Sequence, residues 1–279
     1  MKTTLTTALA SLLGAEIIFA NPISPVPGVA HAARRSARNL RKSNPEIHAL
    51  NDDPHNLTAT NNTQTIRYSN NWAGAVLVDT GFQSVTGTFT VPTVKIPSGG
   101  NSATLYWAST WVGLGGNTCN TAILQTGIYL NIQGDRVFFR PWYEWFPEPA
   151  QVFEDLAVNA GDQLKLTAVA ASTSAGIIVI KNLSTGKQVS QTLSRKIDLS
   201  CQLNAEWIVE DNRLDGKALP FIDFGTTTFT EASVTTLEGA VELSGVEIHD
   251  IMDEQQQVLT SSSISGSSTV SISRTGVLN

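Results

Sequence analysis

The chain has 279 residues, a formal net charge of −6 and a pI near 5.2. Charged residues make up 15% and hydrophobic residues 41%, which suffices for a packed core and excludes disorder over the whole length. The acidic pI argues against nucleic acid as a partner. After the N-terminus no apolar run reaches the ~20 residues that cross a bilayer, so we expect no membrane partner.

Histidine and cysteine are scarce. Of the four histidines, His31, His48 and His55 lie before residue 56, and only His249 lies in the body of the chain. One histidine and two cysteines do not make a His-rich metal centre, so we expect no metal and no cofactor. A serine triad would depend on His249 alone, and no G-x-S-x-G motif accompanies it. We expect His249 to be an exposed structural residue on a strand edge or turn.

Residues 1–20 have the pattern of a secretory signal peptide. Lys2 precedes an apolar and small stretch that ends at Ala20, a plausible cleavage site. We therefore expect a secreted, extracellular protein.

Residues 21–64 differ in composition from everything after them. Prolines open the stretch, and a basic run without an acidic residue follows, made of Arg34, Arg35, Arg38, Arg41 and Lys42. No helix or strand period persists, so the segment is either a flexible linker or a basic propeptide. Our hypothesis is that the basic run binds an acidic cleft in the body, inhibits it, and is released when the cleft carboxylates are protonated.

If the protein is secreted, its N-x-[ST] triplets and its two cysteines become candidates for modification. Asn56, Asn61 and Asn182 each begin an N-x-[ST] triplet and are candidates for glycosylation. Cys119 and Cys201 are the only cysteines, and an even pair in a secreted chain predicts a disulfide. In the chain-entropy model such a bridge stabilises by roughly 4.5 kcal/mol.

The body, residues 65–279, is strand-like throughout. Residues 84–91 alternate apolar with threonine side chains, and turn-forming Gly, Asn, Asp and Ser clusters separate similar segments. The further segments are 72–78, 103–113, 121–132, 136–146, 163–168, 177–183, 205–211, 221–230, 241–248 and 268–273. No helical period lasts three turns, so we predict one all-β domain with two antiparallel sheets packed as a β-sandwich, of jelly-roll or concanavalin A-like type. We expect a monomer.

Three of these segments carry polar groups in apolar surroundings. Residues 121–127 place Gln125 on one strand face with Ile123, unless it is a solvent-facing glutamine. Residues 142–148 place Glu144 between Trp142 and Phe146, as a cleft lining or as the rim of a core strand. Residues 204–211 hold Glu206 and Glu210, which share one face.

The polar segments alone leave three functions open. Paired carboxylates on a concave sheet suit a jelly-roll glycoside hydrolase as well as a peptidase. Exposed aromatic residues also suit a non-catalytic carbohydrate-binding β-sandwich.

Five sequence blocks occur together in a fixed order: 111–113, 117–119, 121–127, 142–145, and 201–211 with Cys201 at its start. In this combination the chain resembles the eqolisin family, the glutamic peptidases of fungi, from about residue 68 to the C-terminus. Residues 69–74 resemble the mature N-terminus of the family. The resemblance implies a β-sandwich and a secreted acid endopeptidase that acts on polypeptides and is made with a signal peptide and a basic propeptide.

The resemblance also implies site residues. Gln125 matches the catalytic glutamine, and Glu210 rather than Glu206 matches the catalytic glutamate. Trp142 and Glu144 match residues that line the site, and Trp72 is expected beside the substrate groove.

The chemistry of such a pair is coherent in acid. A carboxylate with a reference pKa near ~4.3 can still act as a general base where histidine is already protonated. The carboxamide does not titrate, so it can orient a water and donate to the oxyanion at any pH, and one such donor is typically worth ~10²–10³ in rate.

Two positions depart from the pattern. Gly115 and Arg140 stand where the family usually has acidic residues, which changes the expected pH optimum and substrate preference but not the catalytic pair.

Overall fold

The computed structural model describes residues 66–118, 121–195, 199, 202–214 and 217–275. These residues contain no α-helix, and none of their segments is a helix long and apolar enough to cross a membrane. Cys119, Cys201, Asn56, Asn61 and the predicted signal and propeptide lie outside the described residues, so those expectations stay predictions.

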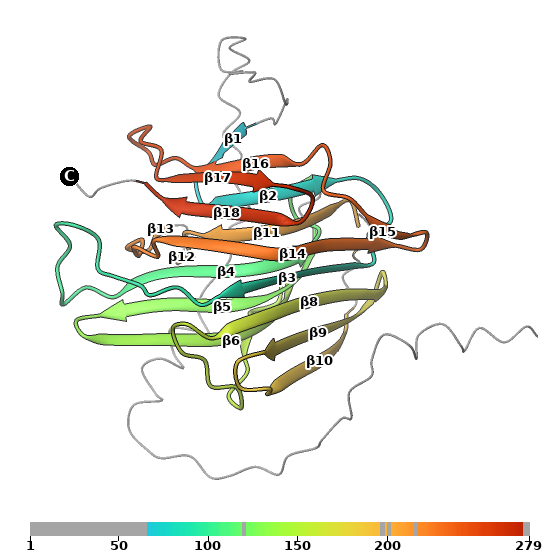
Figure 1. The fold of residues 1–279 in the computed structure, drawn as a ribbon, viewed down its shortest axis with the longest axis horizontal. Helices are drawn as coiled ribbons and strands as arrows, with labels where there is room; N and C mark the ends of the chain where they lie inside the picture. The colour runs from blue at the N-terminus through green and yellow to red at the C-terminus, as the bar shows by residue number, and fades with distance from the viewer. Residues whose placement is uncertain (1–65, 119–120, 196–198, 200–201, 215–216, 276–279) are drawn as a thin grey trace, which may run out of the picture.

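Two large sheets stack face to face, and in Figure 1 the long axes of their strands are nearly aligned, with arrows pointing both ways. We call the first sheet A; its order is β1 (Ile66–Ser69), β16 (Glu247–Ile251), β2 (Trp72–Val78), β11 (Asn204–Glu210), β4 (Tyr106–Leu114), β5 (Ile123–Gln133), β6 (Arg136–Phe146) and β7 (Gln151–Val152). Only β1 and β16 pair in parallel among the described strands of sheet A.

The second sheet, sheet B, is antiparallel. Its order is β10 (Gln188–Ser194), β9 (Ala175–Asn182), β8 (Gln163–Ser172), β3 (Ser84–Thr90), β14 (Thr226–Thr236), β18 (Thr269–Arg274) and β17 (Thr260–Ser265). Short β15 (Gly239–Val241) pairs with β14, and β12 (Arg213–Leu214) pairs with β13 (Lys217–Ala218). The predicted all-β sandwich is confirmed.

The core lies between the sheets, because alternate side chains of each strand point inward. On β5 these are Leu124, Ile128 and Leu130, and on β3 they are Val85 and Phe89. The alternation therefore leaves the odd-numbered residues of β5 on the outer face of sheet A.

Trp207 anchors β11 to the opposite sheet. Its indole Nε1 donates a 2.8 Å hydrogen bond to the main-chain oxygen of Thr86 in β3. Gly87 leaves room for the ring, since a Cβ there would lie 3.0 Å from Trp207 Cδ1. The neighbours of Trp207 in β11, Glu206 and Ile208, point to the other face. The anchor therefore holds the part of β11 that carries Glu206.

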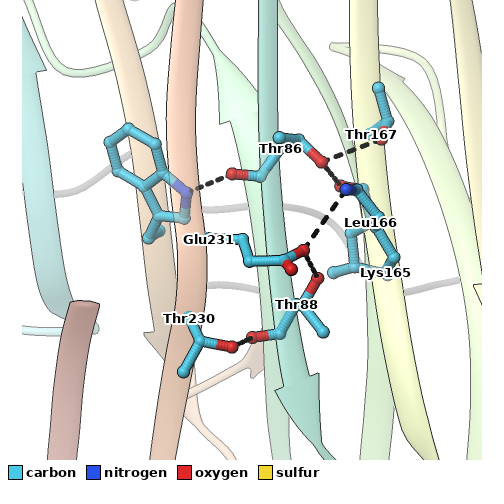
Figure 2. Close-up of polar contacts among 8 residues, drawn as sticks. Thr86, Thr88, Lys165, Leu166, Thr167, Thr230 and Glu231 are labelled. Carbon is cyan, nitrogen blue, oxygen red and sulfur yellow. Dashed lines mark hydrogen bonds and ion pairs between the residues drawn. The ribbon is translucent and has the colours of Figure 1, made fainter. Parts of the chain in front are cut away.

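A polar network covers the outer face of sheet B near this anchor (Figure 2). Thr86 Oγ1 donates to Leu166 O at 2.7 Å, and Thr88 Oγ1 donates to Glu231 Oε2 at 3.0 Å. Glu231 also pairs with Lys165 at 3.3 Å and lies in a register shift of β14 with φ 51°. The network joins three neighbouring strands of sheet B.

Strand β16 of sheet A corrects one expectation. His249 is not an exposed residue on a strand edge: it is 0% exposed and lies in β16, between β1 and β2. The neighbouring Asp250 accepts hydrogen bonds from Thr260 at 3.2 Å and Ser262 at 2.8 Å in β17. Burial raises the pKa of Asp250 to about 6, although these hydrogen bonds act to lower it.

Candidate active site

The outer face of sheet A carries a second apolar cluster, separate from the core. Its buried members are Trp72, Val76, Trp111, Ile123, Tyr129, Trp142 and Ile208. The Trp72 and Trp111 rings meet edge to face with centroids 4.9 Å apart, and Tyr129 stacks on Trp142 at 5.3 Å. We call this surface the site face, because every predicted site residue of the three polar segments points to it.

One row of residues crosses four neighbouring strands of the site face. Glu206 of β11 is the register partner of Gly113 in β4, Gly113 of Gln125 in β5, and Gln125 of Glu144 in β6. Register partners in antiparallel strands point to the same side of a sheet. Gln125 and Glu206 are 0% exposed and Glu144 is 2% exposed. The row thus places the Gln125 carboxamide between two carboxylates, with Glu206 on one side and Glu144 on the other.

Gly113 leaves a gap between Gln125 and Glu206. A Cβ at Gly113 would lie 3.1 Å from Gln125 Cβ and 3.2 Å from Glu206 Oε2. Because both distances start from the same point, Gln125 Cβ and Glu206 Oε2 are no further apart than their sum, 6.3 Å. Glycine also leaves room for the Trp111 ring, whose Cζ3 atom would lie 2.9 Å from such a Cβ, and the Glu206 carboxylate borders the same space.

Glu210 lies in a different row. Its register partners lead through Ser109 to Tyr129, four residues along β5 from Gln125. Four residues of strand span about 13 Å, and two strands span about 10 Å. Glu210 Oε2 accepts from Trp111 Nε1 at 2.9 Å, and Oε1 accepts from Asn71 Nδ2 at 3.4 Å. The structure therefore places Glu206, and not the expected Glu210, across from Gln125.

Carboxylates dominate the electrostatics of the site face. Burial raises the pKa of Tyr129 well above its usual value, and Glu144 and Glu210 raise it further. The phenol consequently keeps its proton and stays a donor. Beside Glu210, burial also raises the pKa of Asp211 well above its usual value. Among the described residues, no group of three or more His, Cys, Asp or Glu side chains has the arrangement of a metal site.

The expected lining residues lie on this face. Trp72 belongs to β2 beside β11, and Trp142 belongs to β6 two residues from Glu144. The sequence interpretation did not assign roles to Gly113 or Tyr129. Period two from Gln125 reaches Tyr129, which is a usable signal, but the position of Gly113 follows only from the strand order.

Asn182 is not suited to carry a glycan. It is fully buried, and its Nδ2 atom, which would bear the sugar, donates to Asp162 Oδ2 at 2.9 Å. Its Oδ1 accepts from the main-chain nitrogens of Ser184 and Thr185. The residue therefore organises the turn after β9, and a sugar on this atom would break the arrangement.

The two departures from the family pattern have different settings. Gly115 has φ +88°, and a Cβ there would lie 2.8 Å from Ala122 O, so a side chain would be strained. Arg140 is the register partner of Tyr129 and shares the face of Trp142. The chain thus has a cation on the site face near Tyr129.

Comparison with known proteins finds related sequences over most of the chain. Residues 70–274 match the family model described as Peptidase A4 family. The chain is 40% identical to Aspergillopepsin-2 of Aspergillus niger over 253 residues, 85% of this chain and 89% of that protein. It is 36% identical to Scytalidopepsin B of Scytalidium lignicola over 281 residues, 98% of this chain and 99% of that protein.

The fold is also similar to solved structures of glutamic peptidases. A scytalido-glutamic peptidase bound to a transition state analog inhibitor matches with a TM-score of 0.66 and 34% identity, over 74% of this chain and 98% of that one. The aspergilloglutamic peptidase from Aspergillus niger matches with a TM-score of 0.58 and 41% identity, over 61% of this chain and 99% of that one.

Proposed function

The chain belongs to the Peptidase A4 family, the eqolisins, and from that premise we propose that Gln125 and Glu206 form its catalytic pair. The chain is a glutamic endopeptidase that acts on polypeptides. Membership leaves no support for the glycoside hydrolase or the carbohydrate-binding alternatives. The observation that carries the assignment is the row in which only Gly113 separates the carboxamide from a carboxylate.

In the proposed reaction Glu206 acts first as a base and then as an acid. It takes a proton from a water while the water oxygen bonds to the scissile carbonyl carbon. The peptide carbonyl oxygen becomes an oxyanion. Glu206 then gives the proton to the peptide nitrogen, the C–N bond breaks, and an amine and a carboxylic acid leave. The carboxylate is regenerated, so the cycle balances with one water consumed.

Gln125 supplies the uncharged part of the machinery. Its Oε1 atom is buried without a hydrogen-bond partner, and its position suits acceptance from the attacking water. One N–H of Nε2 bonds to Glu144 at 3.1 Å, and the other is left for the oxyanion. Because an amide does not titrate, this assistance persists in acid.

The test compares three variants on a denatured protein substrate at acidic pH, with an aspartic-peptidase inhibitor present throughout. Glu206→Gln and Gln125→Ala should lose activity, while Glu210→Gln should lose only about tenfold. If Glu210→Gln is inactive and Glu206→Gln is active, the assignment reverts to Glu210.

We also propose that residues 21–64 act as an inhibitory propeptide. Their basic run complements Glu144, Glu206 and Glu210 on the site face. A synthetic 31–64 peptide should inhibit the mature enzyme near neutral pH and less in acid, where carboxylates take up protons. No inhibition near neutral pH would refute this role.

The fungal origin of the relatives is compatible with the remaining proposals, a secreted extracellular protein and a monomer. N-terminal sequencing of the product in culture medium tests the signal and the leader together. Sedimentation of that product tests its oligomeric state.

A further inference from the structure

We propose that Glu144 is a positioning residue that decides which end of the Gln125 carboxamide faces the reacting water. The inference rests on the catalytic role proposed for Gln125 and extends it to the next strand. It concerns orientation, because an amide side chain has two ends of similar shape and opposite hydrogen-bonding character.

The contact is direct and its frame is rigid. Gln125 Nε2 donates to Glu144 Oε2 at 3.1 Å. The two residues are register partners in β5 and β6, which stay paired from Ile123 to Gln133. Both side chains are nearly or fully buried, so rotation of either one is confined by its neighbours. The backbone thus fixes the distance over which the two side chains interact.

The chemistry of a carboxylate makes the contact one-directional. An ionised carboxylate only accepts hydrogen bonds, so it selects the NH₂ end of the amide and repels the oxygen end. Gln125 Oε1 is then turned away from Glu144, and it is buried with no hydrogen-bond partner. A buried acceptor without a partner is costly unless something outside the protein fills it. The attacking water is such a donor.

A neutral group at position 144 would lose this selection. A protonated Glu144, or a glutamine in its place, can donate to Gln125 Oε1 and so accept the amide in the reversed orientation. The reversed amide would direct N–H groups, rather than an acceptor, toward the hydrogens of the water. The water would then be turned away from the attacking geometry, although substrate binding would be little changed.

The first measurement is steady-state kinetics of Glu144→Gln and Glu144→Asp. We expect Glu144→Gln to lower kcat by about 10- to 100-fold with KM changed less than about threefold. Glu144→Asp keeps the charge and should recover part of kcat. Glu148→Gln is the matched control, because Glu148 follows β6, is 49% exposed and pairs with Arg195 away from Gln125.

The second measurement observes the amide itself. In ¹⁵N-glutamine-labelled enzyme, the Gln125 side-chain NH₂ signals, identified by their loss in Gln125→Ala, should shift with pH as Glu144 titrates. Glu144→Gln should reduce that shift to the part caused by Glu206, which lies across Gly113 from Gln125, and Glu148→Gln should preserve it in full. This readout also serves if Glu144→Gln folds poorly, because wild type and Glu144→Asp supply the same titration.

The outcomes separate this inference from the proposed function. Near-normal kcat in Glu144→Gln, or NH₂ signals that do not titrate in wild type, would overturn the positioning role while Gln125 stays catalytic. Full activity of Gln125→Ala would overturn the proposed function itself, and the positioning role with it.

Discussion

The two outer faces of the sandwich use polar residues in opposite ways. On sheet B, hydroxyls pair across neighbouring strands, as in Thr86 with Thr167 at 3.0 Å and Thr228 with Ser271 at 3.1 Å. On sheet A, Gln125 Oε1 and Trp72 Nε1 are buried without a hydrogen-bond partner. On the outer face of sheet B these hydroxyls therefore serve as partners for one another. On sheet A, these two buried atoms have no hydrogen-bond partner within the protein, and a substrate or a water can supply the missing hydrogen bonds.

The strongest way to break the comparison is to remove the proposed base, Glu206, from sheet A. Glu206→Gln should lower kcat by about 10³-fold or more, since general base assistance is typically worth 10²–10⁴. The folded state should persist, because glutamine has nearly the same shape. Glu210→Gln on the same strand is the control, with an expected loss of about tenfold from its contact with Trp111.

Filling the gap beside the base is expected to have the next largest effect. In Gly113→Ala the new methyl would stand 2.9 Å from Trp111 Cζ3 and 3.2 Å from Glu206 Oε2, so the Trp111 ring must shift and the space where we expect the water is filled. We expect kcat/KM to fall about 100-fold, comparable to the loss of one preorganised contact. Unchanged kcat/KM in this variant, together with a crystal structure that still shows the water beside Glu206, would contradict the gap as the water site.

The sequence alone could not predict which of the two glutamates, Glu206 or Glu210, lies across from Gln125. Period two places both Glu206 and Glu210 on one face, and only the register through β4 distinguishes them. That register depends on which strands are neighbours, a property of the whole sheet. The strand segments themselves were predicted well, with 72–78 and 136–146 matching β2 and β6.

Two strands and the burial of His249 were also not predicted from the sequence. β10 and β17 were not predicted because serine, threonine and glutamine replace the apolar alternation, as in residues 260–265. His249 was expected to be exposed because a lone polar residue usually is. Its burial reflects the parallel pairing of β1 with β16, which sequence patterns do not reveal.

The Trp207 anchor between the two sheets can be tested through the stability of the protein rather than through its activity. Trp207→Phe removes the donor to Thr86 O and leaves that oxygen buried, which should cost about 1–3 kcal/mol of unfolding free energy. Chemical denaturation at fixed pH measures the change. An unchanged midpoint would mean that the hydrogen bond does not contribute to the anchoring of β11.

The buried carboxyl of Asp250 in β16 predicts a pH effect. The pKa of Asp250 is raised to about 6 in the folded state from an ordinary 3.8, so folding favours its protonated form. Its contribution is fully present below about 3.8 and is lost as pH rises through 6. The full shift corresponds to about 3 kcal/mol at most.

The Asp250→Asn variant isolates this effect. Its thermal midpoint should vary less than that of wild type between pH 4 and pH 7. Equal pH dependence of the two proteins would remove Asp250 as the cause.

The smallest effect is expected on sheet B. Thr228→Val removes one of a pair of hydroxyls that lie at the surface, and we expect a change within about 0.5 kcal/mol and full activity. A large loss of activity from this substitution would contradict the division of labour between the two faces.

The placement of Gln125 on β5 and Glu206 on β11 has one more consequence, because β4 lies between them. The β4–β5 hairpin carries Gln125 alone, and Glu206 comes within reach only when β11, far along the chain, pairs with β4. With the proposed pair, a growing chain therefore gains hydrolytic activity only after its later half has been made and β11 has joined the sheet.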